Sequence, residues 1–359
     1  MKRYFFLLLA AVFLLTGCTA PPAEATPDTT ASSLSILPQE QVTTVGISLP
    51  DEQVARWASE GAALKELLQE EAQVILQYAE SDPQIQAEQI GQLIDQKVHC
   101  LVVAAVDSLM LTDVLNRAQA AGILVIAYDR MLVNTNGVSC YVAFDSYQLG
   151  TAVGEYIANT KQLQTAAEEQ RSYTVEFFMG APEDNNSLLF YQGVWDLLQT
   201  YFNTGVLTCP SGRISFEDTC IQGNSPEQAT QMCEATLAEF YPQAMPDILC
   251  AASDALAGGC AVALEKAGCP QETWPLITGA GAEPEAISRL ASGTQALTAQ
   301  ADSQWLPNAC ANLVKSALAG ESFAQKEAVY NGIDAIPASL GELTLIDGKN
   351  DQEVPDSTE

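Results

Sequence analysis

Three short groups of polar residues in this sequence could bind a ligand through hydroxyl groups. Asp129-Arg130 places a carboxylate, which accepts hydrogen bonds, beside a guanidinium, which donates several. Arg56-Trp57 combines a cation with a flat apolar ring, and Asp184-Asn185-Asn186 supplies side chains that accept and donate. Each group taken alone could also be a helix cap or a surface turn. If the groups converge, they form a polar cleft that suits a molecule rich in hydroxyl groups.

The groups lie at the ends of predicted strands. From Val42 to Tyr128 short apolar segments alternate with amphipathic helical segments, and the alternation restarts near Gly150 and continues to Ala319. Continuous apolar strands, such as Cys100 to Val106, are expected where helices cover both faces of a parallel sheet. The sequence therefore predicts an α/β protein with two doubly wound parallel-sheet lobes. Ligands of such folds lie beyond the carboxyl ends of the strands.

The same segments resemble periplasmic sugar-binding proteins of the xylose-binding and multiple-sugar-binding type. The resemblance rests on Val45 to Pro50, Arg56-Trp57, Leu76 to Glu80, Val125 to Arg130, Ala181 to Asn186 and Ser253-Asp254. It runs from about Val42 to Ile346 and is more specific in the first half. It implies a type I periplasmic-binding fold, in which three crossover segments join the two lobes and a ligand binds between them. The positions that match sugar-contacting residues of this family are Arg56, Trp57, Asp129, Arg130, Asn185 and Asp254.

Several positions depart from the pattern of that family. Asp51-Glu52 stands where a basic residue is usual, and Gln222 lies near the place of a stacking tryptophan. Gly279 to Gly281 replaces a Gly-Gln-Asp segment, and Ala301 stands in place of a lysine that binds the ligand. The second half has thus lost several hydrogen-bonding groups. Two alternatives follow: the ligand differs from a free pentose or hexose, or it binds weakly.

The resemblance and the restarted alternation together predict the domain boundaries. Lobe one is expected to comprise residues 42–145 with 281–322, and lobe two residues 146–280 with 323–346. Residues 347–359 are expected to form a polar tail.

The N-terminal residues have the pattern of an export signal. Lys2-Arg3 precedes an apolar run from Tyr4 to Leu15, which is too short for a transmembrane helix and is typical of a signal peptide over residues 1–17. The run ends in a segment that resembles a bacterial lipobox, and the resemblance implies a lipid on Cys18. Residues 18–41 are then the lipid anchor and a flexible tether. An ordinary cleavage site with a chance cysteine is the alternative. Both alternatives predict an extracytoplasmic protein, and the lipobox also predicts that a lipid attaches it to the cell membrane.

The net charge, the cysteines and the single histidine limit the partners, disulfides and metal sites that are expected. A net charge of −30 argues against binding to nucleic acid.

Nine cysteines remain besides Cys18, so at least one is unpaired. Cys209 and Cys220, with ten residues between them, are the best-placed pair for a local disulfide, and the others are expected to be buried thiols. His99 is the only histidine and opens an apolar strand, so it is interpreted as a core residue; no metal or cofactor is expected.

Sequence motifs do not favour catalysis. The chain lacks GxGxxG, GxxxxGK[ST], GxSxG and HExxH, and no catalytic residue is assigned. The predicted function is that of a monomeric solute-binding lipoprotein that delivers a monosaccharide or sugar-like molecule to an ABC permease. A sensor that presents its ligand state to a membrane receptor is the main alternative. A glycoside-processing enzyme is a remote one, since 45 acidic residues leave room for a carboxylate pair.

Overall fold

The computed structural model describes residues 43–323 and 327–348. The described strands are β1 (Thr44–Leu49), β2 (Gln73–Tyr78), β3 (Cys100–Val103), β4 (Leu124–Tyr128), β5 (Cys140–Phe144), β6 (Tyr173–Phe178), β7 (Leu207–Thr208), β8 (Ile248–Ala251), β9 (Leu276–Ile277), β10 (Leu297–Ala301), β11 (Glu327–Tyr330), β12 (Ala335–Gly341) and β13 (Leu343–Asp347). The described α-helices are α1 (Ala55–Leu68), α2 (Pro83–Asp95), α3 (Thr112–Ala120), α4 (Ser146–Thr160), α5 (Leu163–Glu168), α6 (Asn185–Asn203), α7 (Phe216–Thr219), α8 (Pro226–Phe240), α9 (Asp254–Lys266), α10 (Pro284–Ser292) and α11 (Trp305–Leu318).

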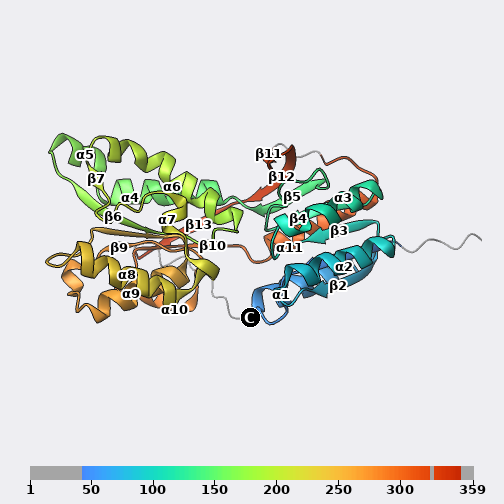
Figure 1. The fold of residues 1–359 in the computed structure, drawn as a ribbon, viewed down its shortest axis with the longest axis horizontal. Coiled ribbons are helices and arrows are strands. Elements are labelled where there is room, and N and C mark those ends of the chain that lie inside the picture. The colour runs from blue at the N-terminus through green and yellow to red at the C-terminus, as the bar shows by residue number, and fades with distance from the viewer. Residues whose placement is uncertain (1–42, 324–326, 349–359) are drawn as a thin grey trace, which may run out of the picture. The chain divides into compact units, whose positions relative to one another are not determined.

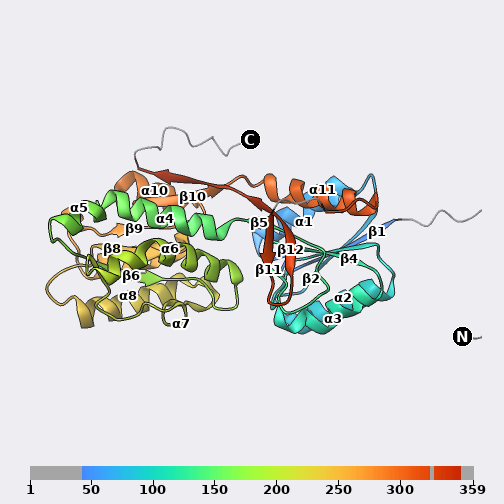
Figure 2. The ribbon, with the colours of Figure 1, turned by 90° about the horizontal axis from the view of Figure 1, so that it is seen from above.

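Lobe one is built on a seven-stranded sheet with the order β11-β12-β5-β4-β3-β1-β2. Strands β1 to β5 and β12 pair in parallel, and β11 pairs antiparallel with β12 at one edge. Helices α2 and α3 cover one face of the sheet, and α1 and α11 cover the other (Figure 2). The α2 residues Ile90, Leu93 and Ile94 are buried against the sheet, as their spacing predicts.

Lobe two is built on the parallel strands β7-β6-β8-β9. The antiparallel pair β10-β13 continues this sheet through a bridge between Thr278 and Leu297. Helices α4 and α6 pack on one face, and α8 and α9 pack on the other (Figure 1). The predicted architecture of two doubly wound lobes is therefore confirmed.

The chain passes between the two sheets three times, but two of the passages differ from the predicted boundaries. The first follows β5, the second follows β10, and the third lies between β12 and β13. Residues 281–301 pack with lobe two and not with lobe one, because β10 pairs with β13 beside β9. Residues 327–341 belong to the sheet of lobe one, because β12 pairs with β5. The prediction failed here because short C-terminal strands were not recognised.

The cysteines of the described residues are free thiols, so the predicted disulfide between Cys209 and Cys220 is wrong. The Sγ atom of Cys209 donates instead to Oε2 of the buried Glu176 at 3.4 Å. His99 accepts a hydrogen bond at Nδ1 from the backbone of Thr44 and is partly buried. Within residues 43–323 and 327–348 no helix is long and apolar enough to span a bilayer, and no cluster of three or more potential metal ligands occurs. Residues 1–42, with Cys18 and the predicted signal peptide, lie outside the described residues.

Candidate functional site

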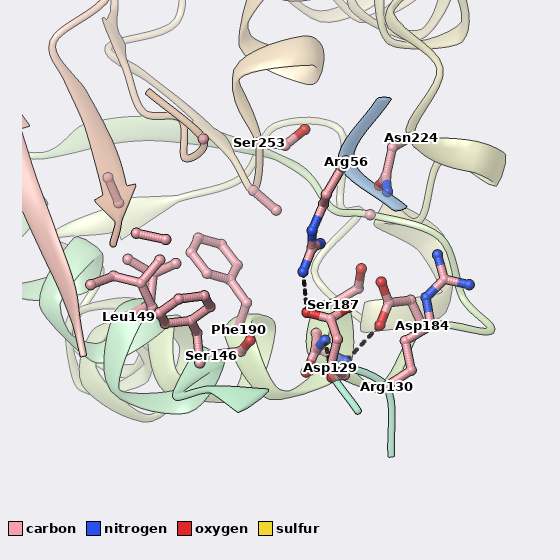
Figure 3. A pocket seen from close by; sticks show the side chains of 18 of the residues that line it. Arg56, Asp129, Arg130, Ser146, Leu149, Asp184, Ser187, Phe190, Asn224 and Ser253 are labelled. Atoms are coloured by element: carbon pink, nitrogen blue, oxygen red, sulfur yellow. Dashed lines mark hydrogen bonds and ion pairs between the residues drawn. The ribbon is translucent and has the colours of Figure 1, made fainter. Parts of the chain in front are cut away.

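A cavity of about 520 Å³ is lined by residues of both lobes (Figure 3). It lies at the carboxyl ends of the parallel strands, where doubly wound folds bind ligands. Lobe one contributes Arg56, Glu60, Asp129 and Arg130. Polar residues of lobe two that line the cavity are Ser146, Asp184, Asn186, Ser187, Asn224 and Ser253.

Arg56 connects the two acidic groups of lobe one. It lies in the first turn of α1, which follows β1, and its Nε donates to Oε1 of Glu60 at 2.8 Å. Its Nη2 donates to Oδ1 of Asp129 at 2.6 Å, so α1 is tied to the end of β4 (Figure 3). A charge-assisted pair of this kind fixes the direction in which both side chains present their remaining polar atoms.

The backbone at Asp129 is held in an unusual conformation. Its φ is +62°, a region that a non-glycine residue rarely adopts, and the residue is only 7% exposed. The Asp129 N–H donates to the carbonyl of Val142, and its own carbonyl accepts from the Tyr141 hydroxyl and from Nδ2 of Asn186, each at 3.0 Å. These contacts compensate for the strain and direct the carboxylate into the cavity.

Trp57 does not line the cavity. Its side chain is 5% exposed and belongs to the core beneath α1 and α11. The guanidinium carbons of Arg56 and Arg130 lie 4.7 and 5.5 Å from the centre of its ring. Arg130 also donates to the carbonyl of Ala105 at 2.9 Å. Trp57 thus supports both arginines through cation–π contacts, which differs from the predicted contact with a ligand.

The start of α6 brings the polar groups of lobe two to the cavity. Asp184 follows β6 and caps α6 by accepting from the Asn186 N–H at 2.9 Å. Asn186 lines the cavity and also bonds across to lobe one, where its Oδ1 accepts from the Tyr141 hydroxyl at 3.3 Å. The predicted residue Asn185 lines a smaller neighbouring cavity instead. A shift of one residue along a helix changes the direction of a side chain by about 100°.

Asp254 is also absent from the lining, although it lies at the start of α9. It is 1% exposed, and its carboxylate accepts from Oγ1 of Thr298, from Nε2 of Gln295 at 2.7 Å and from the N–H of Glu283 at 3.1 Å. The preceding residue, Ser253, lines the cavity. In this structure Asp254 therefore holds the segment after β9 in place and presents no free oxygen to a ligand.

Two acids in the cavity have raised pKa values. Burial raises the pKa of Glu60, an effect that Arg56 partly offsets. Burial likewise raises the pKa of Asp184, against the attraction of Arg130. Glu60 Oε2 and the hydroxyl of the fully buried Tyr128 lack hydrogen-bond partners within the described residues. The cavity thus combines three acids with two guanidinium groups, a set that can accept from and donate to several hydroxyls at once.

Three of the six predicted ligand residues therefore come together in the cavity, namely Arg56, Asp129 and Arg130. Glu60 was not predicted, although its position four residues after Arg56 on a helix is a signal for pairing. Asn224 was also missed. It lies in a short turn with φ +53°, and nothing in the local sequence places that turn beside the cavity.

The chain is similar to known binding proteins over most of its length. A family model described as a periplasmic binding protein domain matches residues 45–322. The multiple sugar-binding periplasmic protein SbpA of Azospirillum brasilense is 31% identical over 311 residues, which are 86% of each chain. The D-xylose-binding periplasmic protein of Escherichia coli is 28% identical and covers 84% of this chain and 86% of its own.

A solved structure shares both fold and sequence with this chain. It is an ABC transporter solute binding protein from Clostridium phytofermentans with bound β-D-glucose. Its TM-score is 0.78 and its identity 31%, and the match covers 87% of this chain and 96% of that chain.

Proposed function

Because the chain belongs to the periplasmic binding protein family, we propose that it captures a sugar in the cavity between its lobes and delivers it to an ABC transporter. The protein acts outside the cytoplasm, as the relatives named periplasmic do. It binds its ligand without converting it.

The observation that carries this proposal is the polar constellation of Arg56, Asp129 and Arg130 opposite Asn186. Arg56 and Asp129 are already paired at 2.6 Å, and Arg130 is held by Ala105 and Trp57. Little side-chain entropy is therefore lost when these groups bind a ligand. Their mixture of donors and acceptors matches the hydroxyl groups of a sugar.

The same contacts argue for binding and not for hydrolysis. A glycosidase needs one carboxyl group that transfers a proton and a second that acts as a nucleophile or base. Asp129 and Glu60 are both engaged by the same guanidinium, at 2.6 and 2.8 Å. A single guanidinium that binds both carboxylates holds their oxygens in fixed positions, which suits a clamp for hydroxyl groups.

The membrane anchor is a part of this proposal that rests on sequence alone. Cys18 follows an apolar run in a segment that resembles a lipobox, and it lies outside the described residues. We expect mass spectrometry of membrane-extracted protein to find a diacylglyceryl group on Cys18 and to find no residues 1–17. An unmodified Cys18 in a soluble protein would contradict the anchor and leave sugar binding untouched. The cavity is formed by one chain, which is consistent with a monomer.

Sugar binding is tested with the folded part of the chain and a panel of pentoses, hexoses and polyols. A thermal-shift screen identifies the ligand, and calorimetry then compares the parent protein with Asp129→Asn. Charge-assisted hydrogen bonds contribute about 1.5–3 kcal/mol, so binding should weaken by roughly ten- to a hundredfold. Asp95→Asn is the matched control, because its side chain is 75% exposed on α2 and should leave affinity unchanged. Equal affinity of Asp129→Asn and the parent would refute the proposed site.

A further inference from the structure

The turn before α8 holds its backbone in an uncommon conformation beside the cavity. Gly223 and Asn224 follow one another with φ values of +64° and +53°. This left-handed region is open to glycine and costs free energy for most other residues, and asparagine is one of the few that tolerate it. Asn224 lines the cavity (Figure 3). A strained residue at a ligand cavity is a candidate for function when the surrounding structure holds it in place.

Hydrogen bonds fix this turn beside the end of β6. The N–H of Ile221 donates to the carbonyl of Met179 at 3.0 Å, and the N–H of Asn224 donates to the carbonyl of Ile221 at 3.2 Å. The Gln222 side chain donates through Nε2 to Oε1 of Glu183 at 2.7 Å. Because the turn is already held in place, it loses little conformational entropy when a ligand binds.

One hydrogen bond determines which way the Asn224 amide faces. Its Oδ1 accepts from the N–H of Ala181 at 3.2 Å. A backbone N–H can only donate, so the atom beside it must be the amide oxygen, and the Nδ2 group points elsewhere. Within the described residues Nδ2 has no hydrogen-bond partner. Asn224 therefore has an unused donor at a position that lines the cavity.

Gly180 leaves the space against which Asn224 and Ser187 both lie. All three residues line the cavity. A Cβ at Gly180 would overlap Oγ of Ser187 and would lie 2.6 Å from Oδ1 of Asn224. Ser187 is 8% exposed, and its hydroxyl has no hydrogen-bond partner in the part of the chain that the structure describes. Two side chains with unused polar atoms thus meet at a position that has no side chain of its own.

These groups differ from the carboxylates of lobe one in what they require of a ligand. Asp129 and Glu60 accept hydrogen bonds, so they need ligand groups that donate. Nδ2 of Asn224 needs a ligand atom that accepts, and the Ser187 hydroxyl can do either. A ligand that fills the cavity and leaves such a donor unpaired loses binding free energy, so this position can discriminate between ligands.

We propose that Gly180, Ser187 and Asn224 form a second ligand subsite and that Asn224 determines specificity there. Nδ2 of Asn224 donates to an oxygen of the ligand, and the Ser187 hydroxyl forms a further hydrogen bond to it. Gly180 keeps the space open for both contacts. The proposal rests on the proposed sugar-binding function and names the residues of lobe two that select among sugars.

The test uses the difference between oxygen and fluorine as ligand atoms. Asn224→Asp keeps an oxygen for the Ala181 N–H and tolerates the left-handed backbone, but it replaces the donor with an acceptor. A ligand hydroxyl could turn and donate to the new carboxylate, whereas the fluorine of a deoxyfluoro sugar can accept and cannot donate. Calorimetry measures the affinity of the tightest-binding sugar of the panel and of each of its monodeoxyfluoro derivatives. At one ring position, we expect the change from hydroxyl to fluorine to weaken binding at least about tenfold more in Asn224→Asp than in the parent.

A ratio of two affinities within each protein cancels a general effect of the added charge or of reduced stability. Asn159→Asp is the matched control, because Asn159 is exposed on α4 and does not line the cavity. If sugars bind and every ring position responds alike in the parent and in Asn224→Asp, the inference is wrong while sugar binding stands. If no sugar binds to the parent, the proposed function fails and this inference fails with it.

Ser187→Ala tests the hydroxyl group of the subsite. The variant removes one hydrogen bond to the ligand, so affinity should fall by about three- to tenfold. Ser288→Ala is the control, because Ser288 is exposed on α10 and its hydroxyl donates to the Pro284 carbonyl of its own helix at 3.0 Å. Unchanged affinity in Ser187→Ala would overturn the assignment of Ser187 to the subsite.

Discussion

At the scale of single residues, charge and burial oppose each other in the cavity. Asp184 is required at the start of α6 because it caps the helix, yet burial disfavours its ionised form. Its pKa is raised above the ordinary value of 3.8 despite the attraction of Arg130. The folded state consequently holds this proton to a higher pH than the unfolded state does. The ionised residue therefore reduces stability as the pH rises through the window between the two pKa values.

Asp184→Asn should stabilise the sugar-free protein at neutral pH. Asparagine caps a helix as well as aspartate does, and it removes the buried charge. The increase in melting temperature should be largest near pH 7. It should shrink as the pH falls through the raised pKa of the folded state and disappear well below 3.8, where the parent carboxyl group is protonated in both states. Thermal unfolding across this pH range measures the difference. A variant that is less stable than the parent at pH 7 would show that the attraction to Arg130 outweighs the cost of burial.

At the scale of secondary-structure elements, the contact between α4 and α6 decides where part of the cavity lies. Gly193 on α6 faces the backbone of α4, and a Cβ there would overlap the carbonyl oxygen of Tyr147. Gly150 on α4 likewise faces the carbonyl of Phe190. The two helices approach this closely only because both positions lack a side chain. Since α6 carries Asn186 and Phe190, the same contact positions two residues of the cavity.

Gly193→Ala should therefore destabilise the protein and disturb ligand binding. The added methyl group meets backbone and not a flexible side chain, so a cost of about 1–3 kcal/mol is expected from overpacking. Urea unfolding gives the free energy, and calorimetry gives the affinity. Gly154→Ala in α4 is the control, because its nearest neighbour is the Leu197 side chain at 3.1 Å and alanine favours a helix. Equal stability of the two variants would contradict this account of the contact.

At the scale of the whole described chain, Asn186 links the lobes without any ligand. Its Nδ2 donates to the carbonyl of Asp129, and its Oδ1 accepts from the Tyr141 hydroxyl. Asp129 and Tyr141 belong to lobe one, whereas Asn186 belongs to α6 of lobe two. Two hydrogen bonds of Asn186 thus link lobe two to lobe one. One of them is made to Asp129, whose carboxylate lines the cavity.

Asn186→Ala should separate the lobes of the sugar-free protein and weaken ligand binding. Loss of both hydrogen bonds removes a preference for the conformation in which the cavity is assembled, and a ligand must then supply that free energy. Small-angle X-ray scattering should give a larger radius of gyration for the sugar-free variant than for the parent. Asn203→Ala is the control, because Asn203 is exposed at the other end of α6. Identical scattering from the parent and Asn186→Ala would argue against a link between the lobes at this residue.

Periodicity and residue type were sufficient for most of the architecture. Amphipathic spacing in α1 and α2 and apolar runs in β3 and β4 determine helices that cover a parallel sheet, because each buries one face. That sheet directs strand ends to one edge, so Arg56, Asp129 and Arg130 could be predicted as neighbours. The family resemblance added the three crossovers.

Tertiary structure decided what depends on contacts between distant segments. Strands β10 to β13 carry weak local patterns, and only pairing with β5 or with each other assigns them to a lobe. Trp57 and Asp254 have the residue types of ligand contacts, yet one is buried under two guanidinium groups and the other is saturated by Thr298 and Gln295. Their roles depend on the groups that already contact them, and three of these, Arg130, Thr298 and Gln295, lie far from them in the sequence. Local pattern thus determined the elements, whereas long-range hydrogen bonding determined which side chains remain free to meet a ligand.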